Sequence, residues 1–304
     1  MEVAPGIHRI ALSPDLATYA LVGERVVLVD AGFAGAARTI DRYLRGLGRS
    51  VAEVALCVIT HAHADHFGGA AEILAAAPGA VLAAHAADAP WIEDPARHLR
   101  ENYGWSAAYG LPHPDALLAR IRAMLGPGAT VGRALADGDA VDAGGWTVRV
   151  HHAPGHSRGH LVLLDPRSGS LLAGDAVADP TLNPPIYYDA MTYRDTLRRL
   201  DGLAAARLLS CHMPVLERPV ARALLADALA HVEACHRLAR DAFAAARDGL
   251  TLPEVASALL AHTGVGEEPR RWAWAAHGHV QALVAEGAIA RRPGGGLPAW
   301  EMRR

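Results

Sequence analysis

Residues 60 to 69 read Thr60-His-Ala-His-Ala-Asp-His-Phe-Gly-Gly69, a stretch that places three imidazoles and one carboxylate close together. It comes directly after the apolar run Val-Ala-Leu-Cys-Val-Ile of residues 54–59, which is typical of a buried strand. A loop at the end of a strand is a favoured place for functional groups. We therefore expect this stretch to be the centre of a metal site.

The spacing inside the stretch suggests two ions rather than one. In an extended segment, residues two positions apart point the same way, so His61 and His63 can hold one ion. The turning chain then directs Asp65 and His66 at a second ion. Four ligands cannot complete two sites, since zinc takes four or five donors at each. Three further side chains follow apolar strand patterns, as His61 does, and can supply the rest: His156, Asp175 and His212.

The segments on both sides of this stretch alternate between strand and helix, which predicts an α/β fold. Short apolar runs predict strands at residues 8–12, 18–22, 26–29, 54–60, 81–84, 140–142, 146–150, 161–164, 170–173 and 207–210. Helical spacing is found at residues 36–46, 69–77 and 114–125. Residues from about 86 to 136 break the alternation, with aromatic side chains scattered among Pro and Gly, and we expect an insertion over the core there.

The last part of the chain has a different character. A long Ala- and Leu-rich helical pattern runs from 219 to 249, a second covers 272–286, and residues 288–303 resemble a hairpin. Helices followed by a terminal hairpin predict a small helical, winged-helix-like C-terminal module. We therefore divide the chain into a catalytic domain at 1–216 and this module at 217–304.

The whole-chain composition and charge bear on the kind of partner and on the compartment, although net charge alone leaves the partner open. The formal charge of −3 over 304 residues gives no general attraction to nucleic acid or to an acidic membrane. No segment approaches the roughly 20 apolar residues that span a bilayer, and the N-terminus does not resemble a secretion signal, so we expect a cytoplasmic protein with no membrane partner. Cys57, Cys211 and Cys235 are too far apart for a CxxC pair, and we expect inert thiols.

The His-x-His-x-Asp-His run with its later His, Asp and His resembles the metallo-β-lactamase superfamily, in particular its glyoxalase II and LACTB-two-like branch. The resemblance covers roughly residues 1–216 and implies an αββα sandwich with metal ions at one edge, between the sheets. It also implies that Asp30, in Val-Leu-Val-Asp-Ala-Gly, orients ligands. The ligand sets it implies are His61, His63 and His156 for the first metal, Asp65, His66 and His212 for the second, and Asp175 bridging both.

Other histidines need no metal to explain them, because a lone histidine is more often a packing or surface residue. We apply this interpretation to a group scattered along the chain: His8, His85, His98, His113, His231, His262, His277 and His279.

The expected chemistry is hydrolysis. Two zinc ions, with iron or manganese as alternatives, can hold a bridging hydroxide near neutral pH and polarise the bond under attack. Asp65 is a candidate proton acceptor and donor. Tyr187 or Tyr188 is a candidate hydrogen-bond donor to the oxyanion, with packing on a loop as the alternative. The aromatic insertion suits an acyl group, so we favour a small carboxylic thioester or lactone as substrate.

Three alternatives stay open at this point. The C-terminal part resembles the winged-helix tail of the LACTB-two-like branch, which implies an endoribonuclease or phosphodiesterase that binds RNA through that module. Its arginines, at 237, 240, 270, 271, 291 and 292, could supply phosphate contacts, although acidic residues are interleaved with them. An iron-dependent dioxygenase could use the same ligands. A regulator whose module binds DNA is a third alternative, against which the intact ligand set argues. The sequence leaves a homodimer open.

Overall fold

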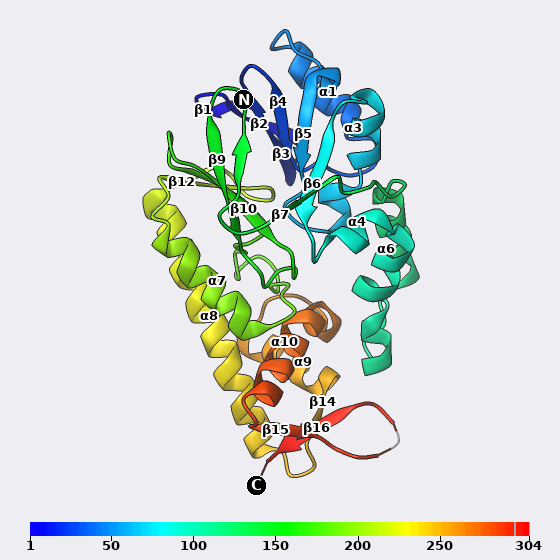
Figure 1. The fold of residues 1–304 in the computed structure, drawn as a ribbon. Helices are drawn as coiled ribbons and strands as arrows, with labels where there is room; N and C mark the ends of the chain where they lie inside the picture. The colour runs from blue at the N-terminus through cyan, green and yellow to red at the C-terminus, as the bar shows by residue number, and fades with distance from the viewer. Residues whose placement is uncertain (295, 304) are drawn as a thin grey trace.

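The computed structural model describes residues 1–294 and 296–303. Two β-sheets lie face to face, with helices on both outer faces (Figure 1). This is the predicted αββα arrangement, and it is confirmed. Gly295, in the loop of the predicted terminal hairpin, and Arg304 lie outside the described residues.

The first sheet has its strands in sequence order. It begins as an antiparallel meander and continues from β4 to β7 with parallel strands. Its strands are β1 (Glu2–Ala4), β2 (Ile7–Ser13), β3 (Leu16–Val22), β4 (Val26–Val29), β5 (Val54–Val58), β6 (Val81–His85) and β7 (Arg133–Leu135).

The second sheet has the order β13-β12-β11-β10-β9-β8, and all of its pairs are antiparallel except β11 with β12. In its centre Leu163 of β10 lies opposite Val150 of β9 and Leu172 of β11. Its strands are β8 (Ala140–Asp142), β9 (Thr147–His152), β10 (Leu161–Asp165), β11 (Ser170–Gly174), β12 (Arg207–Ser210) and β13 (Leu216–Glu217).

Strand β4 shows why these short apolar runs form a sandwich. Successive side chains of a strand point to opposite faces. Val27 and Val29 pack into the core between the two sheets, whereas Val26 and Leu28 pack against the helices outside the first sheet. A strand that is buried on both faces is apolar throughout, as this one is.

The helices of the first half cover the outer face of the first sheet or lie in the segment between β6 and β7. They are α1 (Ala37–Arg45), η1 (Val51–Glu53), α2 (Ala64–Phe67), α3 (Ala70–Ala76), α4 (Ala89–Glu93), α5 (Pro95–His98), η2 (Leu99–Tyr103), η3 (Trp105–Tyr109) and α6 (Asp115–Met124). The predicted insertion contains the last five of them. We expected the insertion to end at about residue 136. In the structure it ends before β7, because β7 pairs with β6 and belongs to the first sheet.

A helix that the sequence reasoning missed, α7 (Ala190–Gly202), covers the second sheet. Asp189 caps it by accepting a 2.7 Å hydrogen bond from the Thr192 amide. Tyr193, Leu197 and Leu200 are buried on one face of the helix. A capping aspartate followed by apolar residues at this spacing is the signal that could have found it.

The C-terminal region is helical, as expected, and it carries a small three-stranded sheet to which β14 adds a strand beyond the expected hairpin. Its longest helix is α8 (Arg218–Ala245), whose buried side chains recur every three or four residues and pack with α7 (Figure 1). Trp272 lies fully buried in the core that this region shares with the second sheet. The remaining elements are β14 (Leu250–Thr251), α9 (Leu252–Thr263), η4 (Pro269–Trp272), α10 (Ala273–Ala285), β15 (Ile289–Arg291) and β16 (Ala299–Met302).

The predicted hairpin is present, because β15 pairs antiparallel with β16. The winged-helix-like assignment of the module stays a prediction. Cys57, Cys211 and Cys235 are buried free thiols. No helix in the described part of the chain combines the length and the apolar character that crossing a bilayer requires.

Candidate metal centre

The His-x-His-x-Asp-His stretch lies where β5 ends. His61 is fully buried in the loop, and His63 has an extended backbone directly before the short helix α2. Asp65 and His66 lie within α2, so the chain turns between the two pairs of side chains. The local fold therefore separates the motif into two halves, as its spacing suggested.

The later ligands come from the second sheet. His156 lies in the loop between β9 and β10, Asp175 follows β11 directly, and His212 follows β12. Strands β11 and β12 run parallel, so their C-terminal ends lie at the same edge of the sheet. That edge faces the loop after β5.

The first cluster combines residues of both sheets. The ligand atoms of His61, His63, His156 and Asp175 all lie within 4.8 Å of one another. The Asp175 Oδ2 atom is 3.9 Å from His61 Nε2 and 3.8 Å from His156 Nε2. His63 directs its Nδ1 atom at His156 Nε2, at 2.9 Å.

The second cluster consists of Asp65, His66 and His212, whose ligand atoms also lie within 4.8 Å of one another. His212 Nε2 is 3.4 Å from Asp65 Oδ2. The same Asp175 Oδ2 atom is 3.3 Å from His212 Nε2 and 3.4 Å from His66 Nε2. One carboxylate oxygen is therefore shared between the two clusters.

Hydrogen bonds at the Nδ1 atoms orient three of the imidazole rings, those of His66, His156 and His212. Asp30 Oδ2 is 2.9 Å from His66 Nδ1, so this nitrogen carries a proton and leaves Nε2 free. His156 Nδ1 bonds the Ile186 carbonyl at 3.0 Å, and His212 Nδ1 bonds the Asp15 carbonyl at 2.8 Å. In each ring the Nε2 atom then faces the clusters.

Asp30 itself is held in an uncommon conformation. Its φ is +70°, a left-handed backbone that few non-glycine residues adopt. The Thr60 amide donates a 2.7 Å hydrogen bond to Asp30 Oδ1 and so helps to hold the carboxylate within hydrogen-bond distance of His66 Nδ1. The placement agrees with the predicted orienting role of Asp30, which stays a prediction.

The side chains fit divalent cations. Buried polar atoms are normally hydrogen-bonded, yet His61 Nε2, His66 Nε2 and Asp175 Oδ1 have no hydrogen-bond partner among the described residues. Although burial opposes it, the carboxylates of Asp175 and Asp65 raise the pKa of His212 to about 10. The clusters thus attract positive charge at their centre. Imidazole nitrogens with carboxylate oxygens are donors that zinc, iron and manganese accept.

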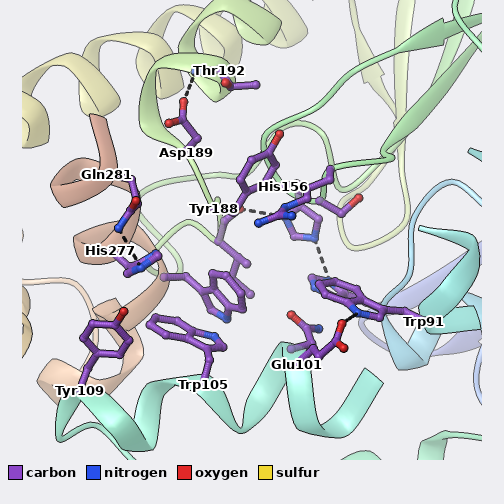
Figure 2. Close-up of a pocket in the computed structure, with 16 residues that line it drawn as sticks. Trp91, Glu101, Trp105, Tyr109, His156, Tyr188, Asp189, Thr192, His277 and Gln281 are labelled. Carbon is purple, nitrogen blue, oxygen red and sulfur yellow. Dashed lines mark hydrogen bonds between the residues drawn. The ribbon is translucent and has the colours of Figure 1, made fainter. Parts of the chain in front are cut away.

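The two candidate tyrosines lie differently. Tyr187 is fully buried, and its hydroxyl is 2.7 Å from Nε2 of His279 in α10. Tyr188 lines a cavity together with His156 (Figure 2), and His63 also borders this cavity. Of the two tyrosines, Tyr188 therefore borders the cavity that reaches the clusters, and its role as a donor stays a prediction.

Sequence reasoning missed Asp88, which ties the two ligand-bearing loops together. Its carboxylate accepts hydrogen bonds from the Ala62 amide at 2.9 Å, the Gly159 amide at 2.7 Å and the Ser157 hydroxyl at 2.6 Å. Ala62 lies between two candidate ligands, and Ser157 follows His156. A single aspartate in an irregular segment carries no pattern that would have revealed this role.

Sequence reasoning also gave no role to His160. Its ring stacks on His61 with the centroids 4.8 Å apart, and its Nε2 atom accepts a 3.2 Å hydrogen bond from the Asp175 amide. His160 is fully buried. It therefore supports ligands of both sheets.

Two cavities meet at the clusters. The larger, of about 650 Å³, reaches His63 and His156 and extends between the segment before β7 and helix α10 (Figure 2). The smaller, of about 190 Å³, reaches Asp175 and His212 and has apolar walls that include Val177, Leu182 and Met213. His156 and Ile186 border both. A molecule held at the clusters would therefore have space on two sides.

The chain resembles one known family and several known proteins. A family model described as the metallo-beta-lactamase superfamily matches residues 15–212. The chain is 30% identical over 169 residues to the acyl-coenzyme A thioesterase MBLAC2 of Gallus gallus, covering 52% of this chain and 56% of that protein. It is 26% identical over 214 residues to the probable metallo-hydrolase YqjP of Bacillus subtilis (strain 168), covering 62% and 64%. The chain thus spans less than two thirds of either relative.

The fold has been seen before in full. The metallo-beta-lactamase family protein TTHA1429 from Thermus thermophilus superposes with a TM-score of 0.79 at 24% identity, over 99% of this chain and 100% of that one. A beta-lactamase domain protein from Burkholderia ambifaria gives a TM-score of 0.75 at 22% identity, over 100% and 93%. These likenesses extend through the C-terminal region.

Proposed function

Because the chain belongs to the metallo-beta-lactamase superfamily and has the fold of its hydrolases, we propose that it hydrolyses small carboxylic thioesters with two zinc ions. Lactones are the second class of substrate to consider. The observation that carries the proposal is the position of Asp175 Oδ2, which lies within 3.9 Å of the Nε2 atoms of four imidazoles: His61, His66, His156 and His212.

The two clusters divide the ligands between the ions. His61, His63 and His156 would hold the first ion and Asp65, His66 and His212 the second, with Asp175 between them. Divalent ions at such a site supply Lewis acidity, which lowers the pKa of a water molecule and polarises a carbonyl oxygen. The fold family implies divalent metal binding, and the number and identity of the ions are part of this proposal.

Two side chains near the clusters have roles of their own. The carboxylate of Asp65 can accept the proton that the attacking water loses; although burial opposes it, His66 and His212 keep its pKa well below the ordinary value. Burial raises the pKa of the Tyr188 hydroxyl, so it stays protonated at neutral pH. Tyr188 can therefore donate a hydrogen bond to the oxygen on which negative charge develops.

Thioester chemistry suits this set of groups. A thiol has an unperturbed pKa of about 8.5, so a thiolate leaves without first being protonated. An amine leaving group would need a stronger general acid than a carboxylate that is held ionised. The relative named acyl-coenzyme A thioesterase MBLAC2 supports the same substrate class.

RNA is a less suitable substrate for the C-terminal region. Arg240 pairs with Glu286, Arg270 with Glu268 and Arg292 with Glu301. Charges neutralised in this way contribute little to phosphate binding. We also propose that residues 1–216 form the catalytic domain and 217–304 a winged-helix-like module that completes the walls of the larger cavity.

The deciding experiment combines metal analysis of the purified protein with hydrolysis assays on a thioester, a lactone and a single-stranded RNA. We expect two zinc ions and thioester turnover, both lost in His61→Ala. His262→Ala, which removes an exposed imidazole outside the clusters, is the matched control and should retain both. Cleavage of RNA alone would replace the proposal with the nuclease alternative. Bound iron without hydrolysis would replace it with the dioxygenase.

A further inference from the structure

A chain of hydrogen bonds runs from the C-terminal helices to the loop before α7. The Tyr187 hydroxyl is 2.7 Å from Nε2 of His279 on α10, and His279 Nδ1 is 3.3 Å from Nδ1 of His236 on α8. His236 Nε2 is 3.1 Å from Glu286 Oε1, and the other oxygen of Glu286 pairs with Arg240. The chain therefore begins at an exposed ion pair and ends at a fully buried tyrosine.

The ion pair at the exposed end fixes the direction in which the protons point. The Glu286 carboxylate, ionised beside Arg240, can only accept, so His236 Nε2 carries a proton. Burial lowers the pKa of His236 and takes that of His279 well below its ordinary value, so each ring is neutral and carries one proton. His236 Nδ1 then accepts from His279 Nδ1–H. His279 Nε2, left without a proton, accepts from the Tyr187 hydroxyl.

Helix α10 also fixes the tyrosine by direct packing. A Cβ atom at Gly278 would lie 2.9 Å from Tyr187 Cδ2 and 3.1 Å from the Tyr187 carbonyl oxygen, so the tyrosine lies directly against the helix backbone. The ring also stacks on Tyr193 of α7, with the centroids 5.0 Å apart and 20° between the planes. Two adjacent residues of α10, Gly278 and His279, therefore hold Tyr187 in place. Helix α10 itself packs against both α7 and α8 (Figure 1).

The position of Tyr187 bears on a candidate metal ligand. A peptide unit is planar, so the Cα atom of Tyr187 helps to set the direction of the Ile186 carbonyl. This carbonyl accepts the 3.0 Å hydrogen bond from His156 Nδ1. The Tyr188 amide donates a 2.9 Å hydrogen bond to the Gly155 carbonyl. Residues 186–188 are thus bonded to the His156 loop at two points, and Tyr187 lies between these points.

We propose that His279, together with His236 and Glu286, is a positioning residue for the metal centre: it holds Tyr187, and through the Ile186 carbonyl it holds His156 in the orientation that the first ion requires. The C-terminal region then acts on the metal centre without contributing a ligand. This inference rests on the proposed assignment of His156 as a ligand. A role in packing alone differs from it, because any side chain of similar size would then serve at position 279.

Two substitutions at the same position separate positioning from packing. His279→Gln retains the pattern of bonds, because an amide oxygen can accept from Tyr187 and an amide nitrogen can donate to His236. His279→Leu fills space but makes neither bond. His231→Leu is the control, because it removes a half-buried imidazole of α8 that takes no part in the chain.

The first readout is zinc affinity, measured by competition with a chromogenic chelator. We expect His279→Leu to bind zinc roughly tenfold more weakly, at the lower end of the effect of losing groups behind metal ligands. His279→Gln and His231→Leu should stay close to the wild-type affinity. Equal affinities in the two variants of His279 would assign the residue to packing and overturn the inference.

The second readout needs neither metal nor substrate. The ¹⁵N chemical shifts of the imidazole rings in the metal-free protein report which nitrogen carries the proton. We expect Nδ1 of His156 and His279, and Nε2 of His236, to be protonated in the wild type. In His279→Leu the His156 ring should become a mixture of tautomers, whereas in His279→Gln it should not. A His156 ring that is unchanged in His279→Leu would overturn the inference, even in a protein that hydrolyses thioesters.

The tautomer measurement also separates this inference from the proposed function. A His156 ring that responds to His279→Leu, in a protein that binds no zinc and cleaves no thioester, would retain the positioning role and reject the hydrolase. If His279→Leu does not fold, Glu286→Ala removes the acceptor at the exposed end and should shift His156 in the same direction by a smaller amount. Glu301→Ala, which breaks an ion pair with Arg292 in the same region, is its control. Equal His156 signals in these two variants would then overturn the inference.

Discussion

The Ser157 hydroxyl donates a 2.6 Å hydrogen bond to the Asp88 carboxylate, which joins the loop of His156 to the residue that precedes α4. Asp88 also accepts bonds from the amides of Ala62 and Gly159. One buried side chain therefore sets the distance between ligands that belong to different sheets. Its contribution can be measured without reference to any substrate.

We expect Asp88→Ala to weaken metal binding roughly 10- to 100-fold, as the loss of groups behind metal ligands does elsewhere. Asp88→Asn should lose less, because its remaining carbonyl oxygen can still accept. Competition with a chromogenic chelator measures the affinity. Asp142→Asn, which alters an exposed carboxylate, is the control. If Asp88→Ala binds metal with the wild-type affinity and still melts cooperatively, the ligand-bearing loops do not need the hydrogen bonds of Asp88.

Removal of the metal should destabilise the sandwich, because the ligands come from both sheets. At a free metal concentration 100 times the dissociation constant, binding contributes about 2.7 kcal/mol. We expect chelation to lower the melting temperature of the wild type by several degrees and to have little effect on Asp175→Ala. His262→Ala should respond as the wild type does. A melting temperature that does not change on chelation would contradict a metal centre that joins the sheets.

The two tyrosines should respond differently to loss of the hydroxyl. Tyr188→Phe removes the proposed oxyanion donor, whose residue lines the larger cavity, and we expect kcat to fall roughly 100-fold with little change in melting temperature. Tyr187→Phe leaves His279 without its 2.7 Å partner and should cost about 1 to 3 kcal/mol of stability. Steady-state kinetics and denaturant melts of both variants measure these effects. The reverse pattern would assign the catalytic donor to Tyr187.

His98 should make the folded state sensitive to acid. The side chain is fully buried, and burial lowers its pKa from 6.5 to about 3. The unfolded chain therefore binds a proton below about pH 6.5 that the folded protein does not bind until about pH 3, so stability falls as the pH falls through this window. Between pH 7 and pH 5 the loss is about 2 kcal/mol.

His98→Phe retains a ring among Phe67, Trp91 and Tyr103 and cannot be protonated. Urea melts at pH 7 and pH 5 should show a smaller loss of stability in this variant, by about 2 kcal/mol. An equal loss in both proteins would mean that His98 finds water or a partner when charged.

The parts of the fold that the sequence predicted are those with a strong periodic signal. Short apolar runs such as 26–29 are typical of strands buried on both faces, and the candidate ligand motif follows another such run directly. The unpredicted parts depend on contacts between distant residues. Asp88 has its partners at Ser157 and Gly159, and β7 was included in the insertion because only its pairing with β6 reveals a strand.

The adjacent tyrosines show a second limit. Side-chain direction follows from the period of a helix or a strand, and Tyr187 and Tyr188 lie in an irregular loop. The burial of Tyr187 depends on a hydrogen bond to His279 in α10, far along the chain. The sequence could identify the pair but not choose between its members.

The division of the ligands between the two sheets also matters while the protein is being made. The β5 loop supplies its four side chains early, whereas His212 follows β12, shortly before α8 begins. A polypeptide interrupted before His212 has an incomplete set of donors, even if its first sheet has formed correctly. Under the proposed ligand assignment, full metal binding therefore requires that the chain has been synthesised through His212 and that the two sheets have packed against each other.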